Sequence, residues 1–435
     1  MWQSPSSDLE SAFLDLVVEG RLLLGGEIQD AAIGIENGMI SRVARHVPGD
    51  ERICISNGII IPAFVDSHVH MREPGGEKKE DFRTGTTAAV FGGVTTVLDM
   101  PNTNPPTLNL SGFEAKHELA RAKSLCDFGL YMGVQGNSQP SDIPDSAVGY
   151  KLYLGATTGP LLVRDMETIA RTVSMAAQNG VPVALHGEDQ DVLEREGRRP
   201  EDLKDHARLR PPEAEVRAIG KLLSMDTRWL HLCHLSSKEG LDALGEWKGT
   251  VEVTPHHLLL DNTVSLEVES YGKVNPPLRH RSHRIALWEA VLSGRIDTMG
   301  SDHAPHTEVE KDDDFSLAPS GLPGVETMGP LMLAQVAKKR LPLPRLVELL
   351  AANPAGRFGL AKGEIREGMD ADLQVVDIRT LKKIDPGNLH SRCGWTPYEG
   401  MEAVFPTMVI CRGEVAVEDG ELAVRPGFGR GVRRC

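Results

Sequence analysis

The sequence predicts an α/β fold, a (β/α)8 TIM barrel with a small β-sandwich domain built from its N- and C-terminal flanks. Through roughly 300 central residues, short apolar runs alternate with helical segments, which is the pattern of a parallel sheet. Eight such units favour a TIM barrel, whose usual length is about 250 residues and often more with insertions. Both ends of the chain instead carry short apolar runs separated by glycine-containing turns. A doubly wound open sheet is the alternative for the centre.

The two flanks share one pattern. Residues 13–43 contain apolar pieces around the turns Gly25-Gly26 and Asn37-Gly38, which indicate antiparallel hairpins. Residues 363–377 and 408–417 repeat this pattern near the C-terminus. Each flank is too short to bury a core alone, so we expect the two to combine. The predicted division is residues 1–61 and 362–435 for the small domain and residues 62–361 for the barrel.

Each barrel strand is predicted from an apolar run bounded by turn residues. The eight candidate strands are Ile59–Val65, Val94–Met100, Phe128–Val134, Val148–Tyr153, Val181–His186, Trp229–His234, Val251–Pro255 and Ile296–Ser301. The helical segments between them are Asp81–Phe91, Gly112–Ala122, Arg164–Gln178, Ala214–Leu223, His283–Leu292 and Pro330–Lys338. In such a barrel the C-terminal strand ends meet at one mouth, where the chemistry takes place.

Composition and charge narrow the class of protein. The 435 residues carry a formal net charge of −15, which argues against nucleic acid or an anionic membrane as the main partner. Six scattered cysteines without a CxxC pair are typical of a reducing cytosol. The acidic N-terminus lacks the features of a signal peptide, and no run of roughly 18 apolar residues predicts a membrane span. We therefore expect a cytoplasmic protein.

Histidines gather at the predicted strand ends. His68 and His70 are two residues apart, so both project from the same face of an extended strand. Polar residues at the other strand ends are Lys151, His186, His234 and Asp302, followed by His303 and His306. Imidazole ligands suit zinc best among the common metals. A single strand-end histidine is usually structural, but this convergence on one mouth predicts a metal centre.

Lys151 is the ambiguous member of this set. Its ammonium form would be repelled by a cation, so it ligates only if it is neutral or is converted by carbon dioxide into a carbamate. A lysine that neutralises Asp302 is the alternative. Two neighbouring metals would lower the pKa of a shared water towards ~7 and give a hydroxide nucleophile. Asp302 would accept and return the proton, and this combination hydrolyses an amide-like bond or runs the reverse condensation.

Several motifs in order along the chain resemble the amidohydrolase superfamily, and within it most closely the dihydroorotase family. They are DSHVHMREPG (66–75), TGTTAAVFGGVTTV (84–97), DMPNTNP (99–105), GYKLY (149–153), LHGE (185–188), HLCHLS (231–236), TPHHL (254–258), KVNPPLR (273–279), GSDHAPH (300–306) and GMDADL (368–373). The resemblance implies reversible cyclisation of N-carbamoyl-L-aspartate to L-dihydroorotate in de novo pyrimidine (UMP) biosynthesis. It also implies a homodimer and allows an association with aspartate transcarbamoylase.

The resemblance assigns roles residue by residue. The metal ligands it implies are His68, His70 and Asp302 for the first zinc ion, His186 and His234 for the second, and carboxylated Lys151 as the bridge. The substrate-binding residues it implies are Arg72, Asn102 and His306, which would hold a carboxylate, and Asn275. For Asn275 the alternative is a loop residue that satisfies its own backbone. Thr157-Thr158-Gly159 resembles a substrate-covering loop, with a simple turn as the alternative. His231 is interpreted as structural and Cys233 as a buried thiol.

Two alternatives to this function remain. Another cyclic amidohydrolase, namely a hydantoinase, a dihydropyrimidinase or an allantoinase, would share the fold and the metal ligands. Arg72 and Asn102 argue against it, because they suit a ring that bears a carboxylate. The second alternative is an inactive scaffold partner of aspartate transcarbamoylase. Such relatives lose metal ligands, whereas this chain keeps the full set.

Overall fold

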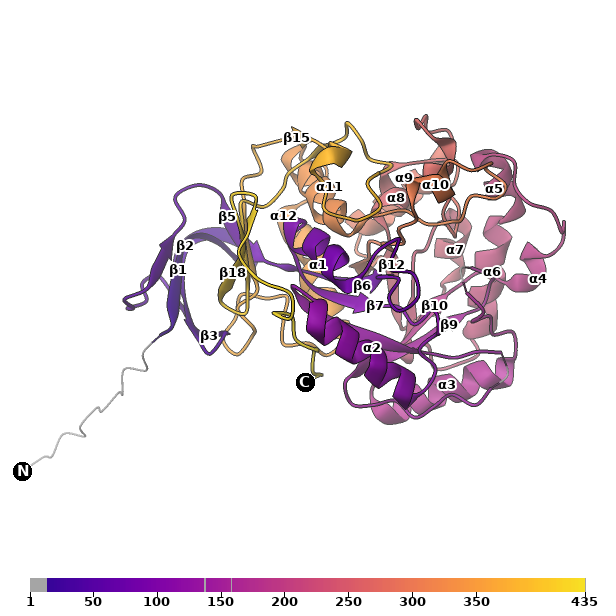
Figure 1. Ribbon diagram of the computed structural model, residues 1–435, viewed down its shortest axis with the longest axis horizontal. Coiled ribbons are helices and arrows are strands. Elements are labelled where there is room, and N and C mark those ends of the chain that lie inside the picture. The colour runs from indigo at the N-terminus through magenta and orange to yellow at the C-terminus, as the bar shows by residue number, and fades with distance from the viewer. Residues whose placement is uncertain (1–13, 137, 158, 435) are drawn as a thin grey trace, which may run out of the picture.

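The computed structural model describes residues 14–434 except residues 137 and 158, and it shows a barrel beside a smaller sheet (Figure 1). The barrel sheet has eight strands that follow one another in chain order, each paired in parallel with the next. They are β6 (Phe64–Val69), β7 (Val94–Asp99), β8 (Asp127–Gly133), β9 (Ala147–Tyr153), β10 (Val183–His186), β11 (Leu230–Leu232), β12 (Thr250–Val253) and β13 (Thr298–Met299). The sheet closes where Val69 pairs with His303, whose carbonyl accepts a hydrogen bond from the His70 amide at 2.7 Å. The predicted (β/α)8 barrel is confirmed.

Helices surround this sheet on the outside (Figure 1). They are α1 (Phe82–Phe91), α2 (Leu110–Lys123), α3 (Met166–Asn179), α4 (Gln190–Leu193), α5 (Leu203–Leu209), α6 (Pro212–Leu222), α7 (Lys238–Ala243), α8 (Pro255–Leu259), α9 (Arg281–Leu292), α10 (Glu308–Lys311), α11 (Val325–Ala337), α12 (Leu343–Val347) and α13 (Asn353–Arg357). Helix α3 illustrates how the sequence determines where these helices begin, end and pack. The Asp165 side chain caps its first turn, Gly180 ends it at a φ of 63°, and Ile169, Val173 and Ala176 bury one face at helical spacing.

The two flanks combine, as the sequence predicts, and in place of the two layers of a sandwich their strands pair into one continuous nine-stranded sheet. Its strands are β1 (Leu16–Leu24), β2 (Glu27–Glu36), β3 (Met39–Ala44), β4 (Arg52–Cys54), β5 (Ile59–Pro62), β14 (Leu373–Val376), β17 (Met408–Cys411), β18 (Glu414–Glu418) and β19 (Glu421–Leu422). The antiparallel pairing of β5 with β14 joins N-terminal to C-terminal residues. Val18, Ile33, Ile60 and Leu373 share a buried cluster, so neither flank closes its core alone.

One strand prediction is wrong. The apolar run Ile59–Val65 is not a single barrel strand, because β5 belongs to the small sheet and the barrel begins with β6. The switch takes one residue: the Ala63 amide donates to Asp372, and the Phe64 amide donates to Gly93. The residues of the run are buried both in β5 and in β6. The apolar pattern therefore does not reveal where the chain passes from the small sheet to the barrel.

The predicted helix start at Pro330 is also wrong. Helix α11 begins at Val325, after Gly324, and keeps Pro330 in its interior. A proline is expected at a helix start because it lacks an amide donor and its ring crowds the preceding turn. The helix is nevertheless held in place because it is buried along almost its whole length, between the barrel and the C-terminal flank. Tertiary packing overrides the local preference here.

The C-terminal flank also packs against the barrel. The short pair β15 (Lys382–Lys383) and β16 (Glu402–Ala403) stands apart from the large sheet, and the Trp395 indole donates to the His306 carbonyl at 2.7 Å. The Val432 amide donates to the Phe128 carbonyl on β8 at 2.8 Å. Within the described part of the chain, no helix is long and apolar enough to cross a membrane.

A buried ion-pair network links the barrel to the small sheet. The Lys362 ammonium lies 2.8 Å from Asp127, at the start of β8, and 2.7 Å from both Asp370 and Asp372. The guanidinium of Arg412 also pairs with Asp127. Charges this deeply buried are tolerated only when they are paired and hydrogen-bonded, so the network fixes how the two parts fit together.

Candidate metal centre and substrate cavity

A cavity opens at the C-terminal ends of the barrel strands. Nine of the ten predicted site residues line it: His68, His70, Arg72, Asn102, Lys151, His186, His234, Asn275 and Asp302. The tenth, His306, borders the cavity through Arg72, since its Nε2 lies 3.1 Å from an Arg72 Nη2. Residues that are distant in sequence therefore meet at one mouth, as expected for strand ends of a barrel.

The first predicted ligand group is closely assembled. Asp302 Oδ1 lies 3.3 Å from His68 Nε2 and 3.1 Å from His70 Nε2. The three potential ligand atoms lie within 4.8 Å of one another, and all three residues are at most 9% exposed. Two imidazoles and one carboxylate in this arrangement form a donor set that suits zinc.

The outer nitrogen of each histidine is held by a second residue. His68 Nδ1 lies 2.8 Å from Glu252 Oε1, and His70 Nδ1 lies 2.7 Å from Asn102 Oδ1. Each acceptor fixes the tautomer with the proton on Nδ1, which leaves the Nε2 lone pair facing Asp302. Sequence reasoning missed Glu252. A lone glutamate in the apolar strand β12 was the available signal, because such a residue is rarely buried without a partner.

In the second predicted group, a second residue holds the outer nitrogen of one of the two histidines. His186 Nδ1 faces His234 Nε2 at 3.0 Å, while His186 Nε2 lies 2.9 Å from Glu188, which the sequence reasoning also missed. Arg210 pairs with that glutamate from the far side. The inner nitrogens of both histidines therefore point toward each other across the cavity floor.

Lys151 is completely buried beside this group. Its ammonium donates to Cys233 Sγ at 3.2 Å, and no carboxylate of the described residues lies within ion-pair distance. The predicted alternative, a lysine that neutralises Asp302, therefore lacks its contact. The predictions for two residues in and just after β11 agree with the structure. His231 contacts Thr250 and Glu252, and the Cys233 thiol is buried.

The four histidines are held in the neutral form that binds metals. Burial lowers the pKa of His68 and His186, and it lowers the pKa of His70 and His234 well below the ordinary value. A neutral imidazole keeps a lone pair for coordination, whereas an imidazolium has none. The donor set thus fits divalent metal ions.

Arg72 dominates the substrate side of the cavity. The side chain is 8% exposed, its Nε donates to the Pro305 carbonyl at 3.0 Å, and it has no ion pair among the described residues. Burial lowers the pKa of Arg72 to about 10, so the guanidinium stays charged at neutral pH. A buried cation that lacks a protein carboxylate is a ready partner for an anionic substrate group.

His206, Tyr153 and Thr157 also contribute to the substrate side of the cavity. His206 Nε2 lies 3.0 Å from Asn275 Oδ1, and it thereby positions a residue that the sequence had predicted. Tyr153 also lines the cavity; its buried hydroxyl has no hydrogen-bond partner in the described structure, and its position went unnoticed in the sequence. Of the predicted loop, Thr157 lines the cavity and Gly159 is exposed, whereas Thr158 lies outside the described residues.

The backbone is strained at three positions of the site. Arg72, His234 and Asp302 have φ values of 62°, 38° and 47°, in the left-handed region that side chains rarely adopt. Each follows closely on a barrel strand, where the turn aims the side chain into the cavity. Such strain costs about 1–3 kcal/mol per residue and typically gathers at functional sites.

Comparison with known proteins agrees with this geometry. The family model described as "Amidohydrolase family" matches residues 59–416, which cover the barrel and most of the C-terminal flank. The chain belongs to the amidohydrolase family. Amidohydrolases depend on metal ions, and the ligand groups described above fit that requirement.

Similar proteins extend over nearly the whole chain. The protein named dihydroorotase from Methanosarcina acetivorans is 40% identical, with 94% of this chain and 93% of that protein covered. The dihydroorotase from Halobacterium salinarum is 38% identical, with 96% and 100% covered. Among solved amidohydrolase structures, the L-hydantoinase from Arthrobacter aurescens superposes with a TM-score of 0.90 at 28% identity, with 97% and 100% covered.

Proposed function

We propose that this amidohydrolase is a dihydroorotase, which interconverts N-carbamoyl-L-aspartate and L-dihydroorotate in pyrimidine biosynthesis. The observation that carries the proposal is Arg72, a buried cation that lines the cavity and pairs with no carboxylate among the described residues. Dihydroorotate bears a ring carboxylate, which a guanidinium can hold by two parallel hydrogen bonds. The identity of 35–40% to proteins named dihydroorotase, over more than nine-tenths of this chain, supports the same substrate.

The polar lining can orient the ring around that anchor. Asn102 and Asn275 offer amide groups that can donate to and accept from the ring's amide edges. The Tyr153 hydroxyl can donate to a ring oxygen, because burial raises its pKa well above the ordinary value and keeps it protonated. His306 lies behind Arg72 and supports it. The Nδ1 atom of His306 lies 3.0 Å from the Lys79 ammonium and accepts a hydrogen bond from it.

We infer that the ligand set holds two zinc ions. His68, His70 and Asp302 would bind one, His186 and His234 the other, and a carbamate on Lys151 would bridge them. Bound zinc supplies a Lewis acid that polarises the ring amide and makes water acidic enough to be a nucleophile near neutral pH. Among the described residues no carboxylate lies within ion-pair distance of Lys151. This favours the carbamate, since that form would remove an otherwise uncompensated buried cation.

Asp302 moves the proton in this scheme. Ring opening places the water oxygen on the amide carbonyl carbon, breaks the carbon–nitrogen bond and delivers a proton to the departing nitrogen. Asp302 accepts that proton from the water and returns it to the nitrogen, and the cyclisation runs the same path in reverse. Burial raises the pKa of Asp302, which brings the carboxylate closer to the basicity that proton transfer needs.

Hydantoin-type ring opening is the second candidate function. The likeness to the L-hydantoinase structure favours it, but a hydantoin or dihydrouracil ring presents no carboxylate to Arg72. An inactive scaffold accords poorly with a complete ligand set. A homodimer and an association with aspartate transcarbamoylase stay predictions.

A parallel turnover assay tests the proposal. Metal-replete protein is offered dihydroorotate, hydantoin, dihydrouracil and allantoin, and the metal content is measured on the same sample. We expect ring opening of dihydroorotate alone, with at least two metal ions per chain. Preferred turnover of a ring without a carboxylate would refute the proposal that Arg72 binds the substrate carboxylate. Absence of any turnover in the presence of bound metal would instead favour the scaffold.

A further inference from the structure

A chain of polar contacts leads to Arg72 from the outer side of His306. Glu310 Oε1 lies 3.0 Å from the Lys79 ammonium, which in turn lies 3.0 Å from His306 Nδ1. At the other edge of the ring, His306 Nε2 lies 3.1 Å from Arg72 Nη2 and 3.1 Å from the Ser320 carbonyl oxygen. The His306 side chain is 1% exposed, so its hydrogen bonds must come from these neighbours.

The position of one proton on His306 decides which of these contacts can form. Burial lowers the pKa of His306 well below its ordinary value, so the ring is neutral and carries its single proton on Nδ1 or on Nε2. With the proton on Nε2, the ring donates to the Ser320 carbonyl and accepts from Lys79. With the proton on Nδ1, the ring accepts from Arg72, but its N–H then faces an ammonium that can only donate. The first form makes two of these hydrogen bonds and the second makes one, so the Lys79 ammonium favours the first.

We propose that Lys79 is a positioning residue for substrate binding, which holds the proton of His306 on Nε2 and thereby keeps the Arg72 guanidinium available for the substrate carboxylate. A protonated Nε2 cannot accept from Arg72 Nη2, so the imidazole does not engage that donor. In the opposite form, the ring would compete with the carboxylate for the same hydrogen. The inference rests on the proposed function, because it takes Arg72 as the carboxylate anchor.

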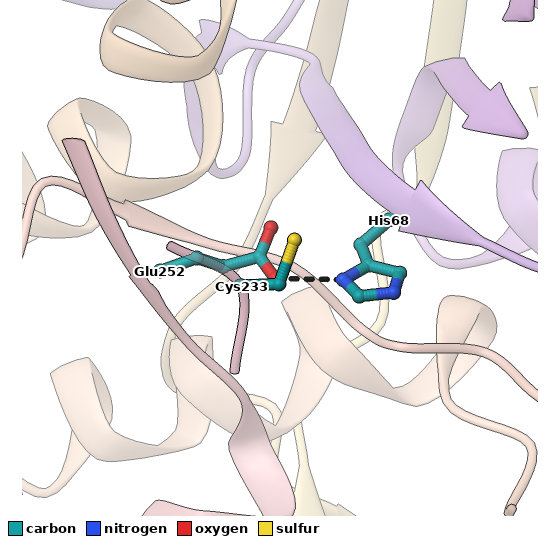
Figure 2. Close-up of side chains that lie close together, drawn as sticks. All are labelled: His68, Cys233 and Glu252. Carbon is teal, nitrogen blue, oxygen red and sulfur yellow. Dashed lines mark hydrogen bonds and ion pairs between the residues drawn. The ribbon is translucent and has the colours of Figure 1, made fainter. Parts of the chain in front are cut away.

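The metal ligand His68 shows the opposite arrangement. Its Nδ1 faces an acceptor, the Glu252 carboxylate at 2.8 Å, which places the proton on Nδ1 and leaves the lone pair on Nε2 (Figure 2). His306 has a donor in place of that acceptor, so its proton moves to the other nitrogen. The group behind each ring therefore decides whether the ring offers the cavity side a lone pair or an N–H.

Glu310 keeps Lys79 in the form that donates. Its Oε2 accepts from the Thr307 amide at 3.1 Å in the capping box of α10, which aims Oε1 at Lys79. Burial lowers the pKa of Lys79, and the Glu310 carboxylate opposes this shift and so favours the ammonium. A neutral amine could accept from the imidazole, and the ion pair disfavours that alternative.

Nuclear magnetic resonance of the ring nitrogens tests the position of the proton directly. Full-length, zinc-loaded protein is prepared with isotope-labelled histidine, and the His306 signals are identified by their absence from His306→Gln. We expect the proton on Nε2 in the wild type, and a shift of population toward Nδ1 in Lys79→Met. Lys79→Arg should restore the wild-type form, because a guanidinium also donates. A wild-type ring protonated on Nδ1, or a ring unchanged in Lys79→Met, would overturn the proposal.

Lys78 provides a matched control for the loss of charge. Its side chain is 73% exposed and lies 3.8 Å from the same Glu310 oxygen, and within the described structure it makes no hydrogen bond to His306. Lys78→Met should therefore keep the wild-type proton position and the wild-type kinetics.

Steady-state kinetics show whether the effect reaches the substrate through His306. Lys79→Met should raise KM for dihydroorotate about tenfold with little change in kcat, and it should leave dihydrouracil unaffected, because that ring bears no carboxylate. In a His306→Gln background the same substitution should add no further loss. An equal loss in Lys78→Met, or additive losses from Lys79→Met and His306→Gln, would show that Lys79 acts only as a general charge and would overturn the proposal.

The outcomes also separate this inference from the proposed function, because the proton position is measured without turnover. Normal opening of dihydroorotate by Lys79→Met, with His306 unchanged, would overturn this inference alone. A shifted proton in Lys79→Met, together with no opening of dihydroorotate by any of the proteins, would refute the proposed function and still support the control of His306 by Lys79.

Discussion

Replacement of Arg72 by methionine should convert the substrate preference of the enzyme. The methionine keeps the length and the apolar stem but removes the buried charge, and the strained backbone at this position is no worse for methionine than for arginine. Two charge-assisted hydrogen bonds to the ring carboxylate are lost, each of which contributes about 1.5–3 kcal/mol. A loss of about 3 kcal/mol in transition-state binding corresponds to a roughly 100-fold lower kcat/KM for dihydroorotate.

Dihydrouracil supplies the matched control for Arg72→Met, because it is the same ring without the carboxylate. Its kcat/KM should stay level or rise, since the wild-type cavity presents it with a desolvated cation that pairs with no carboxylate of the described residues. The assay is steady-state ring opening of both compounds by both proteins, at equal metal content. A similar fall for the two substrates, or a fall of less than about tenfold for dihydroorotate, would refute the carboxylate assignment.

Three further predictions follow from the structure. Asp302→Asn should lower kcat by at least about 100-fold while most of the metal stays bound, as turnover and metal analysis on one sample would reveal; retained activity would exclude the proton shuttle. Lys362→Met should lower the free energy of unfolding by about 3–5 kcal/mol in urea, because it leaves buried carboxylates uncompensated, whereas the exposed control Lys383→Met should change little. Burial lowers the pKa of His206 to about 3, so the unfolded chain takes up a proton near pH ~6.5 that the folded chain refuses. Stability should therefore fall as the pH drops from about 6.5 towards 3, and less so in His206→Gln; equal losses would contradict this.

Sequence reasoning recovered the elements that carry a periodic signal. Alternation of apolar runs and helical segments predicted the barrel, and strand-end histidines such as His68 and His186 predicted where the cavity lies. This succeeds because a TIM barrel places its functional groups at one end of each strand. Position along the chain then translates almost directly into position in space.

The supporting residues escaped the sequence reasoning for a physical reason. Glu252 contacts His68, which is 184 positions away in the sequence, and Glu188 contacts the ring of His186, two residues earlier. Their acidic side chains sit in apolar strands or turns whose pattern gives no sign of the partner. The sequence likewise does not reveal that the chain passes from the small sheet to the barrel at Ala63, because both sheets bury apolar residues equally well. Tertiary pairing, rather than local propensity, decides these features.

Contacts within the protein set the geometry of the metal ligands. Glu252 and Asn102 fix the histidine tautomers, and the turns at His234 and Asp302 hold strained backbone that the packed barrel sustains. A site whose geometry depended on the ion would collapse in its absence, as small zinc modules do. Here the fold must supply the strain energy, so we expect chelation to remove activity while the barrel stays folded. Less of the metal-binding free energy is then consumed in assembling the ligands, and more of it stabilises the bound ions.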